Sequence, residues 1–133
     1  MKNNILENKS KLFAVNTITL CKRMKKRCQM HEMVSQILRS GTSIGANVHE
    51  ANYASSKADF INKLQIALKE CHETEYWLDI FQQTKLITDD EFNFLSEKCG
   101  DLKRILVKSI KTAKANLLKR KLEKRMKNKN AEH

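Results

Sequence analysis

Three histidines in this sequence are each followed directly by a glutamate, a combination that could bind a metal and activate a water molecule. The pairs are His31–Glu32, His49–Glu50 and His72–Glu73. A zinc-protease helix needs a second histidine four residues after the first, so that both imidazoles lie on one helix face. Positions 35, 53 and 76 hold serine or tyrosine instead. None of the three pairs therefore predicts a zinc site.

Cysteines offer two further kinds of chemistry. Cys28 and His31 have the spacing of half a zinc site, but no second pair of similar spacing exists. Cys71 precedes His72, but the sequence places no third group to orient a nucleophile. The four cysteines are widely spaced and three fall on apolar faces, so we expect reduced core thiols. We therefore predict no enzymatic activity, no metal and no cofactor.

Two of the three glycines, Gly41 and Gly45, have the spacing G-x-x-x-G. A glycine-rich loop can cradle a phosphate, but it needs a strand before it and a helix that starts within it. Here both glycines lie inside a helical pattern that runs from Val34 to Ala51. Glycine destabilises a helix by about 1 kcal/mol relative to alanine, so we interpret the pair as a notch that another helix backbone enters. That helix belongs either to the same chain or to another subunit.

The elements that position these residues are helices. The chain has 133 residues, no proline and 3 glycines, a composition that favours helices over sheets. Apolar residues recur at steps of three and four, least regularly in the first segment. There we expect Leu12, Val15 and Ile18 to form one face, which Phe13, Ala14, Leu20 and Cys21 widen. The expected helices are about 9–27, 32–54, 56–86, and 88–118 and beyond.

Helix starts and short connections predict the architecture. Ser56 and Thr88 each begin a sequence that resembles a capping box, and acids at positions 89–91 favour a helix N-terminus. Connections of only a few residues force neighbouring helices to run antiparallel. We therefore predict an all-α fold, an antiparallel up-down-up-down four-helix bundle over residues 1–118. A basic C-terminal extension, helical or frayed, follows over residues 119–133.

Positive charge is concentrated at the C-terminal end. Of the net charge of +11, residues 103–133 contribute 12 Lys and Arg against 2 acids, net +10. Such segregation indicates a polyanionic partner, most commonly nucleic acid, although basic tails also serve solubility. The expected contacts are Lys103, Arg104, Lys108, Lys111, Lys114, Lys119, Arg120, Lys121, Lys124 and Arg125, with the basic cluster at residues 22–27 as a second patch.

The segments RSGTSIGANVHEA and SSKADFINKLQIALKECHETEYWLDI resemble the four-helix-bundle family of 23S rRNA intervening-sequence proteins. The resemblance covers about residues 10–118. The matching positions are Ser43, Ile44, Asn47, Val48 and Glu50, then Ser56, Asp59 and Phe60, then Ile66, Ala67 and Glu73. Two departures are glycine at position 45, where the family often has proline, and alanine at position 51, where it often has glycine.

The resemblance implies a bundle that assembles into a ring-like homopentamer and has no enzymatic activity. Similar bundles are accessory proteins of diversity-generating retroelements, where they bind a reverse transcriptase and structured RNA. From the residues themselves, we expect Asn47 and Glu50 to hydrogen bond across helices, because they lie beside the apolar seam. Apolar side chains off the main seams also favour an oligomer, namely Ile61, Leu68, Trp77 and Ile110.

Two functions are consistent with the sequence. In the first, a non-enzymatic oligomeric bundle binds structured RNA, or an RNA-bound partner such as a reverse transcriptase, through its basic surface. In the second, the protein is a homo-oligomeric scaffold without a nucleic-acid role. No apolar run approaches the roughly 20 residues that span a bilayer, and the N-terminus lacks the apolar centre of a secretory signal. We therefore expect a cytoplasmic protein with no membrane partner and no small-molecule substrate.

Overall fold

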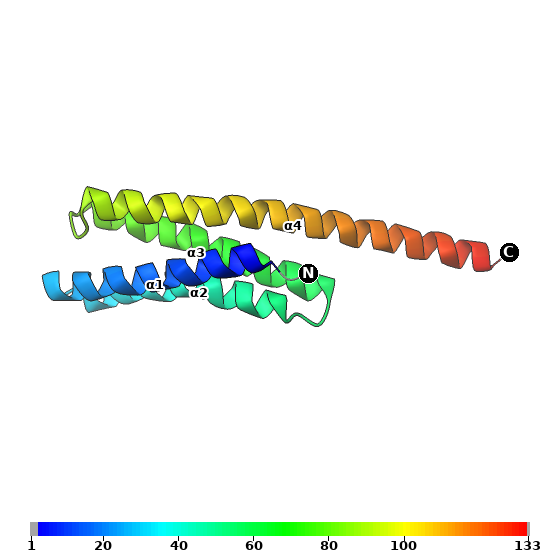
Figure 1. The fold of residues 1–133 in the computed structure, drawn as a ribbon, viewed down its shortest axis with the longest axis horizontal. Coiled ribbons are helices and arrows are strands. Elements are labelled where there is room, and N and C mark those ends of the chain that lie inside the picture. Colours follow the sequence, from blue (N-terminus) through cyan, green and yellow to red (C-terminus); the bar gives the residue numbers. More distant parts are fainter. Residues whose placement is uncertain (1–2, 133) are drawn as a thin grey trace.

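Four helices make up the fold in a computed structural model that describes residues 3–132. They are α1 (Asn4–Arg27), α2 (His31–Asn52), α3 (Lys57–Gln83) and α4 (Asp89–Ala131). Consecutive helices run antiparallel, and the N-terminal end of α1 lies near the turn between α2 and α3 (Figure 1). α1 packs closely on α2 and more loosely on its other neighbour, α4. The predicted all-α, up-down-up-down four-helix bundle is confirmed.

α1 is longer than the apolar pattern indicates. It begins at Asn4, whereas the pattern placed its start near residue 9. The side-chain oxygen of Asn3 accepts a hydrogen bond from the Leu6 backbone N–H at 3.0 Å and caps the helix. Leu6 itself is fully buried. The first turn of α1 is therefore part of the packed bundle.

α3 and α4 begin at the expected caps. The Ser56 hydroxyl oxygen accepts a backbone hydrogen bond in the first turn of α3. At the start of α4, the Thr88 hydroxyl accepts from the Glu91 N–H at 3.1 Å, and the Glu91 carboxylate accepts from the Thr88 N–H at 2.9 Å. α4 then continues unbroken to Ala131. The basic extension, for which a helical and a frayed state were both open, is thus helical up to that residue.

The apolar seams predicted for α2, α3 and α4 form the core. Their buried members are Val34, Ile37, Gly41, Ile44, Val48 and Ala51, then Phe60, Leu64, Ala67, Cys71, Thr74, Leu78 and Phe81, then Leu95, Cys99, Leu102, Leu106 and Ala113. Cys21, Cys71 and Cys99 are free and buried. Burial raises the pKa of Cys21 to about 11. These thiols are therefore inert packing residues.

The face predicted for α1 is confirmed only in part. Leu12, Val15 and Ile18 are 57%, 53% and 39% exposed, so this part of the prediction is wrong. The residues of α1 that are buried are Leu6, Ser10, Phe13, Thr17, Leu20, Cys21 and Met24, of which Phe13, Leu20 and Cys21 were expected. Ser10 and Thr17 are small and polar, so hydropathy gives no sign that they face the core. They are buried because α1 approaches α2 closely at these two positions, next to Gly41 and Gly45.

Gly41 and Gly45 form the predicted notch, and the helix that enters it is α1 of the same chain. A Cβ at Gly41 would lie 2.7 Å from Thr17 Cγ2, and a Cβ at Gly45 would lie 3.1 Å from the Ser10 carbonyl oxygen. A Cβ at Gly41 would therefore require Thr17 to move, whereas a Cβ at Gly45 would be a tight contact. Small residues of α1, Ser10 and Thr17, occupy the positions of close approach. The Thr17 hydroxyl donates a hydrogen bond to the Phe13 carbonyl at 2.8 Å within its own helix.

The polar residues that follow the glycines do not bond as expected. Asn47 donates from Nδ2 to the Ser43 carbonyl at 2.8 Å, so it bonds within α2 and not across helices. The Ser43 hydroxyl likewise donates to the Arg39 carbonyl at 2.6 Å. Both residues are half-buried beside Ile44, which is fully buried. The expectation that Asn47 fixes helix register across the bundle is therefore wrong, because a carbonyl of its own helix satisfies it.

Glu50 does reach another helix, but from the surface. Its carboxylate lies 3.4 Å from Lys63 Nζ of α3, and its side chain is 59% exposed. The buried polar contact between α2 and α3 is one that the motif did not indicate, because the Thr74 hydroxyl bonds to the Ser40 hydroxyl at 2.9 Å. This pair, and not Glu50, is the polar contact inside that interface.

Two of the four apolar residues that favoured an oligomer belong to the core of a single chain. Ile61 and Ile110 are each 7% exposed, and Leu68 and Trp77 are half-buried against the core. A single chain therefore buries Ile61 and Ile110, although their positions off the apolar seams had suggested that another subunit would cover them. Exposed apolar side chains lie instead on the outer side of α1, at Leu12, Val15 and Ile18.

Polar contacts at two ends hold α1 to α4. At one end, the Glu91 carboxylate lies 2.7 Å from both Arg27 Nη1 and Arg23 Nε. At the other end, Asn3 Nδ2 donates to the Ser109 hydroxyl at 3.3 Å. The hydrogen bonds from Arg27 and, to a smaller extent, Arg23 lower the pKa of Glu91 to about 2. The carboxylate of this clamp therefore stays charged at neutral pH and loses its charge only as the pH falls towards 2.

The notch predicts opposite effects for two glycine substitutions. Gly41→Ala is expected to lower the free energy of unfolding by about 1–3 kcal/mol, because the new methyl group overlaps Thr17. Gly100→Ala is the control: its nearest neighbour is Arg104 Nη1 at 3.6 Å, so it should stabilise α4 by up to about 1 kcal/mol. Thr17→Ala should offset part of the Gly41→Ala loss. Equal denaturant midpoints for the two alanine variants would contradict the notch.

The Glu91 clamp predicts a stability that depends on pH. The pKa of Glu91 falls from its ordinary value of 4.5 to about 2 on folding, so the clamp contributes fully above about pH 4.5 and is lost as the pH falls towards 2. Glu91→Gln should therefore destabilise by about 1–3 kcal/mol at pH 7 and much less at pH 2. Glu97→Gln, on an exposed residue of the same helix, is the control. A gap between parent and Glu91→Gln that stays constant in urea melts from pH 7 to 2 would contradict this role.

Candidate nucleic-acid interface

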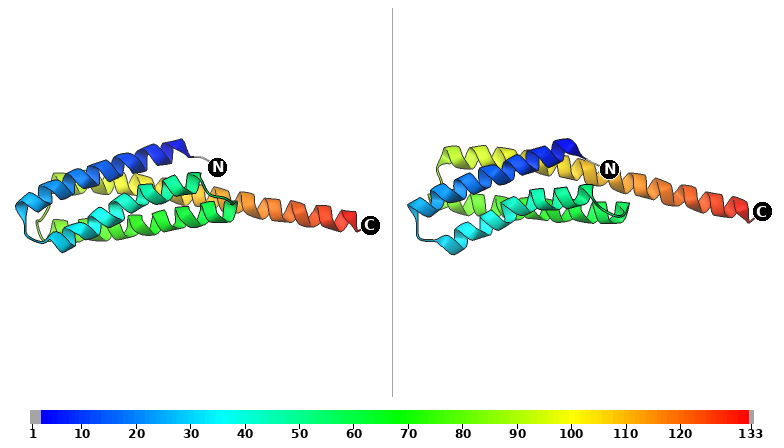
Figure 2. Two further views of the ribbon diagram at one scale, coloured as in Figure 1. Left: turned by 90° about the horizontal axis from the view of Figure 1, so that it is seen from below. Right: turned by 60° about the horizontal axis from the view of Figure 1, so that its bottom comes forward.

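α4 continues past the end of the bundle. Ala113 is its last buried residue, and Leu117 is the last that packs against the core. Residues 118–131 are exposed, and this part of the helix projects beyond the N-terminus of α1 and the turn between α2 and α3 (Figures 1 and 2). We call residues 114–131 the projecting segment. Its side chains are open to a partner on every side beyond Leu117.

Most of the cations expected to contact nucleic acid are exposed and make no salt bridge within residues 3–132. They are Lys108, Lys111, Lys114, Lys119, Arg120, Lys121, Lys124 and Arg125. Arg104 differs because it is paired with Asp101 of its own helix. Lys103 also differs, since its Nζ lies 3.0 Å from the Glu75 carboxylate of α3. These two residues belong to the bundle surface more than to the projecting segment.

The free cations surround the helix instead of forming one face. Lys108 and Lys111, together with Arg104, follow steps of four and three and lie on one side of α4. Lys119, Arg120 and Lys121 are consecutive, as are Lys124 and Arg125, so their side chains point in different directions from the helix axis. The projecting segment is thus a positively charged rod, suited to phosphates on more than one side.

The basic cluster at residues 22–27 is a separate surface. It ends α1, at the end of the bundle opposite to the projecting segment (Figure 1). Its two arginines are held by Glu91, while its three lysines are exposed. The two basic patches expected from the sequence therefore lie at opposite ends of the molecule and cannot form one continuous surface.

The projecting segment also carries an apolar stripe that the sequence reading missed. Leu118, Leu122 and Met126 are 59%, 50% and 67% exposed. Their steps of four place them along one side of the helix. The spacing is visible in the sequence, but it follows a different side of α4 from the core seam. The segment is accordingly amphipathic as well as basic.

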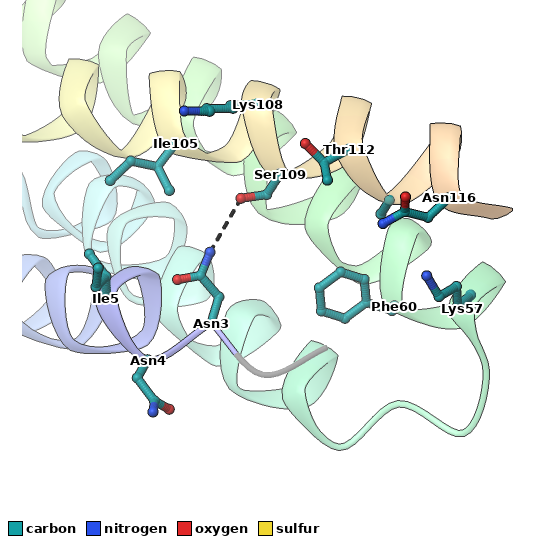
Figure 3. A pocket seen from close by; sticks show the side chains of 11 residues that line it. Asn3, Asn4, Ile5, Lys57, Phe60, Ile105, Lys108, Ser109, Thr112 and Asn116 are labelled. Atoms are coloured by element: carbon teal, nitrogen blue, oxygen red, sulfur yellow. Dashed lines mark hydrogen bonds between the residues drawn. The ribbon is translucent and has the colours of Figure 1, made fainter. Parts of the chain in front are cut away.

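A cavity of about 780 Å³ lies where the projecting segment leaves the bundle (Figure 3). One side is formed by α4 and the other by the first turns of α1 and α3. Phe60, Ile105 and Ala113 give it apolar walls, and Lys57 and Lys108 add positive charge. Because three helices contribute, no local spacing in the sequence could have revealed this site.

Catalytic and metal-binding features are not apparent in the described part of the chain. No group of three or more His, Cys, Asp or Glu side chains within residues 3–132 is placed to hold a metal ion. A hydrogen bond with Cys99 and burial raise the pKa of Cys71, the opposite of what a nucleophile needs. None of the helices in this range is both long and apolar enough to cross a bilayer.

The fold thus defines a helical-bundle protein with one elongated basic helix. The chain matches the 23S rRNA-intervening sequence protein family over residues 2–108, and it belongs to that family. A crystal structure of a protein of unknown function from the S23 ribosomal protein family of Bacteroides thetaiotaomicron is 45% identical, with a TM-score of 0.78. The alignment covers 80% of this chain and 98% of that one. No curated protein matches the chain.

The family match ends before the projecting segment begins. Residues 109–133 lie beyond it, and the alignment with the Bacteroides protein leaves a fifth of this chain uncovered. The matched residues therefore include most of the bundle, whereas the projecting segment lies outside them. Much of the positive charge of the chain lies in that segment.

Proposed function

We propose that this protein is a non-enzymatic bundle that binds structured RNA through the projecting segment of α4. The observation that carries the proposal is the set of exposed cations, from Lys108 to Arg125, that no acid of the described chain neutralises. Mutual repulsion of these charges opposes the extended helix. A polyanion relieves that repulsion and releases its own counterions, which favours binding.

The same surface could serve an RNA that is already held by another protein, such as a reverse transcriptase. Contacts of this kind are made to phosphates, so they give affinity and orientation without much sequence preference. Cytoplasmic location fits this role and is part of the proposal.

Self-association is the second part of the proposal, and pentamers are implied by the family resemblance. It is supported by the outer side of α1, where Leu12, Val15 and Ile18 expose a contiguous apolar surface that the bundle leaves uncovered. The same observation favours the second candidate function, a homo-oligomeric scaffold without a nucleic-acid role. The two candidates differ in what the cations of α4 do.

Removing charge from α4 tests RNA binding. Replacing Lys119, Arg120 and Lys121 by Gln should weaken binding to a structured RNA. The slope of log affinity against log salt should become shallower by up to about 2, at about 0.7 per phosphate contact on single strands. The melting temperature should hardly change, because these side chains are exposed.

The matched control removes the same number of charges at the other end, from Lys22, Lys25 and Lys26. It should leave the affinity and the slope near those of the parent. Deleting residues 119–133 should have a larger effect than either triple variant, since it removes 7 Lys and Arg. If both triple variants bind like the parent, the scaffold is favoured and the RNA proposal fails.

Adding charge to the apolar side of α1 tests assembly. Val15→Glu places a carboxylate on the exposed surface and is expected to dissociate the oligomer at micromolar concentration while leaving the fold intact. Gln36→Glu, on an exposed position of α2, adds the same charge and should not. The measurement is sedimentation velocity. A parent protein that sediments only as a 15.5 kDa species would show that the chain does not self-associate.

A further inference from the structure

We propose that the cavity at the root of the projecting segment binds one unpaired nucleotide of an RNA held along α4. This inference rests on the proposed RNA-binding function and adds to it a site for a base. The cavity volume of about 780 Å³ falls within the usual range of small-ligand sites, about 300–1,000 Å³. The cavity is also the place where the basic helix meets the bundle (Figure 3).

Two lysines supply the phosphate contacts. Lys57 is the first residue of α3, and Lys108 lies on α4 across the cavity. Neither side chain makes a salt bridge within residues 3–132. A cation at the first position of a helix is opposed by the helix dipole, so Lys57 occupies a position where it lowers helix stability. Binding of an anionic ligand in the cavity offsets this unfavourable interaction between Lys57 and the helix dipole.

Apolar and amide groups supply the contacts to the base. Phe60 and Ala113 are 6% and 7% exposed and line the cavity together with Ile105. Asn116, which follows on α4, offers an amide that can both donate and accept hydrogen bonds. Within the described chain, the Asn116 side chain makes no hydrogen bond. An unpaired base presents a matching combination of an apolar face and a hydrogen-bonding edge.

One polar pair closes the inner wall of the cavity and is not available to a ligand. Asn3 Nδ2 donates to the Ser109 hydroxyl at 3.3 Å (Figure 3). This bond joins the start of α1 to α4 and so fixes the two sides of the cavity relative to each other. The hydrogen-bonding groups left for a base therefore lie further along α4, towards the projecting segment.

The cavity is continuous with the proposed RNA surface. Lys108, Thr112 and Asn116 follow steps of four, so they lie on one side of α4 and all line the cavity. Lys119 and Arg120 lie one turn further, in the projecting segment. A strand whose phosphates contact that segment can reach the cavity with its next nucleotide. Bulges and loops, whose bases are free of pairing, are the RNA elements that suit such a site.

The test compares three RNA hairpins that differ at one position. The first is fully paired, the second carries a single-nucleotide bulge, and the third carries the same bulge without its base. The parent should bind the bulged hairpin about five- to tenfold more tightly than the other two, the range expected for one accommodated base. Binding is measured by fluorescence anisotropy, with free nucleoside monophosphate as a competitor.

Two variants and one control locate the effect. Thr112→Trp fills the cavity from an exposed position and should remove the preference for the bulge without weakening binding to the paired hairpin. Lys57→Gln should reduce the preference without filling the cavity. Asn93→Trp is exposed on the same helix and lines none of the cavities described here, so it should behave like the parent.

The outcomes separate this inference from the proposed function. Salt-sensitive binding with no preference for the bulge, or a preference that Thr112→Trp and Lys57→Gln both leave intact, would overturn the nucleotide site alone. Absence of salt-sensitive binding to any hairpin would overturn the RNA-binding function and the site with it. A free monophosphate that competes at the concentration at which the bulged hairpin binds would show that the cavity takes a free nucleotide instead, and would also overturn the inference.

Discussion

The close approach of α1 to α2 at Gly41 and Gly45 determines how the rest of the bundle is arranged. Thr17 lies too close to Gly41 for a methyl group there, and Ser10 lies close to Gly45, so these two contacts restrict the rotation of α1 about its axis. That rotation turns Leu12, Val15 and Ile18 outwards and leaves the side of α1 that faces α4 loosely packed. α4 is then joined to α1 by the Glu91 clamp and by the Asn3–Ser109 hydrogen bond. The contact at the glycines thus accounts both for the exposed apolar side chains of α1 and for the loose packing between α1 and α4.

The projecting segment depends on a different balance. Beyond Leu117 no other helix packs against it, so its helicity derives from the bundle as a preformed nucleus and from the high helix propensity of Leu, Lys, Arg, Met and Glu. Closely spaced like charges work against that helicity. The helix of such a segment is stabilised by a ligand that neutralises its positive charge. We therefore propose that the cations of α4 bind a polyanion and do not serve solubility alone.

The fold was predictable from the sequence because the seams of α2, α3 and α4 repeat at steps of three and four, and the caps at Ser56 and Thr88 are strong. The face of α1 was predictable only in part, since its contact with α2 is made by Ser10 and Thr17, which hydropathy does not mark as buried. The hydrogen bond predicted from Asn47 to another helix was wrong, because its side chain donates to a carbonyl of its own helix. The cations of α4 were found from composition, whereas the cavity was not, because Lys57, Phe60 and Asn116 meet only in the folded chain.

The position of the cavity also bears on how a shared bundle can acquire its own ligand. The family match covers Lys57, Phe60, Ile105 and Lys108 but ends at residue 108, whereas Thr112, Ala113 and Asn116 lie beyond it. Bundle residues therefore form one side of the cavity, and the continuation of α4 completes the other. If the site binds a nucleotide, the continuation of α4 contributes more than charge: it forms part of the cavity, next to the cations that we propose contact RNA.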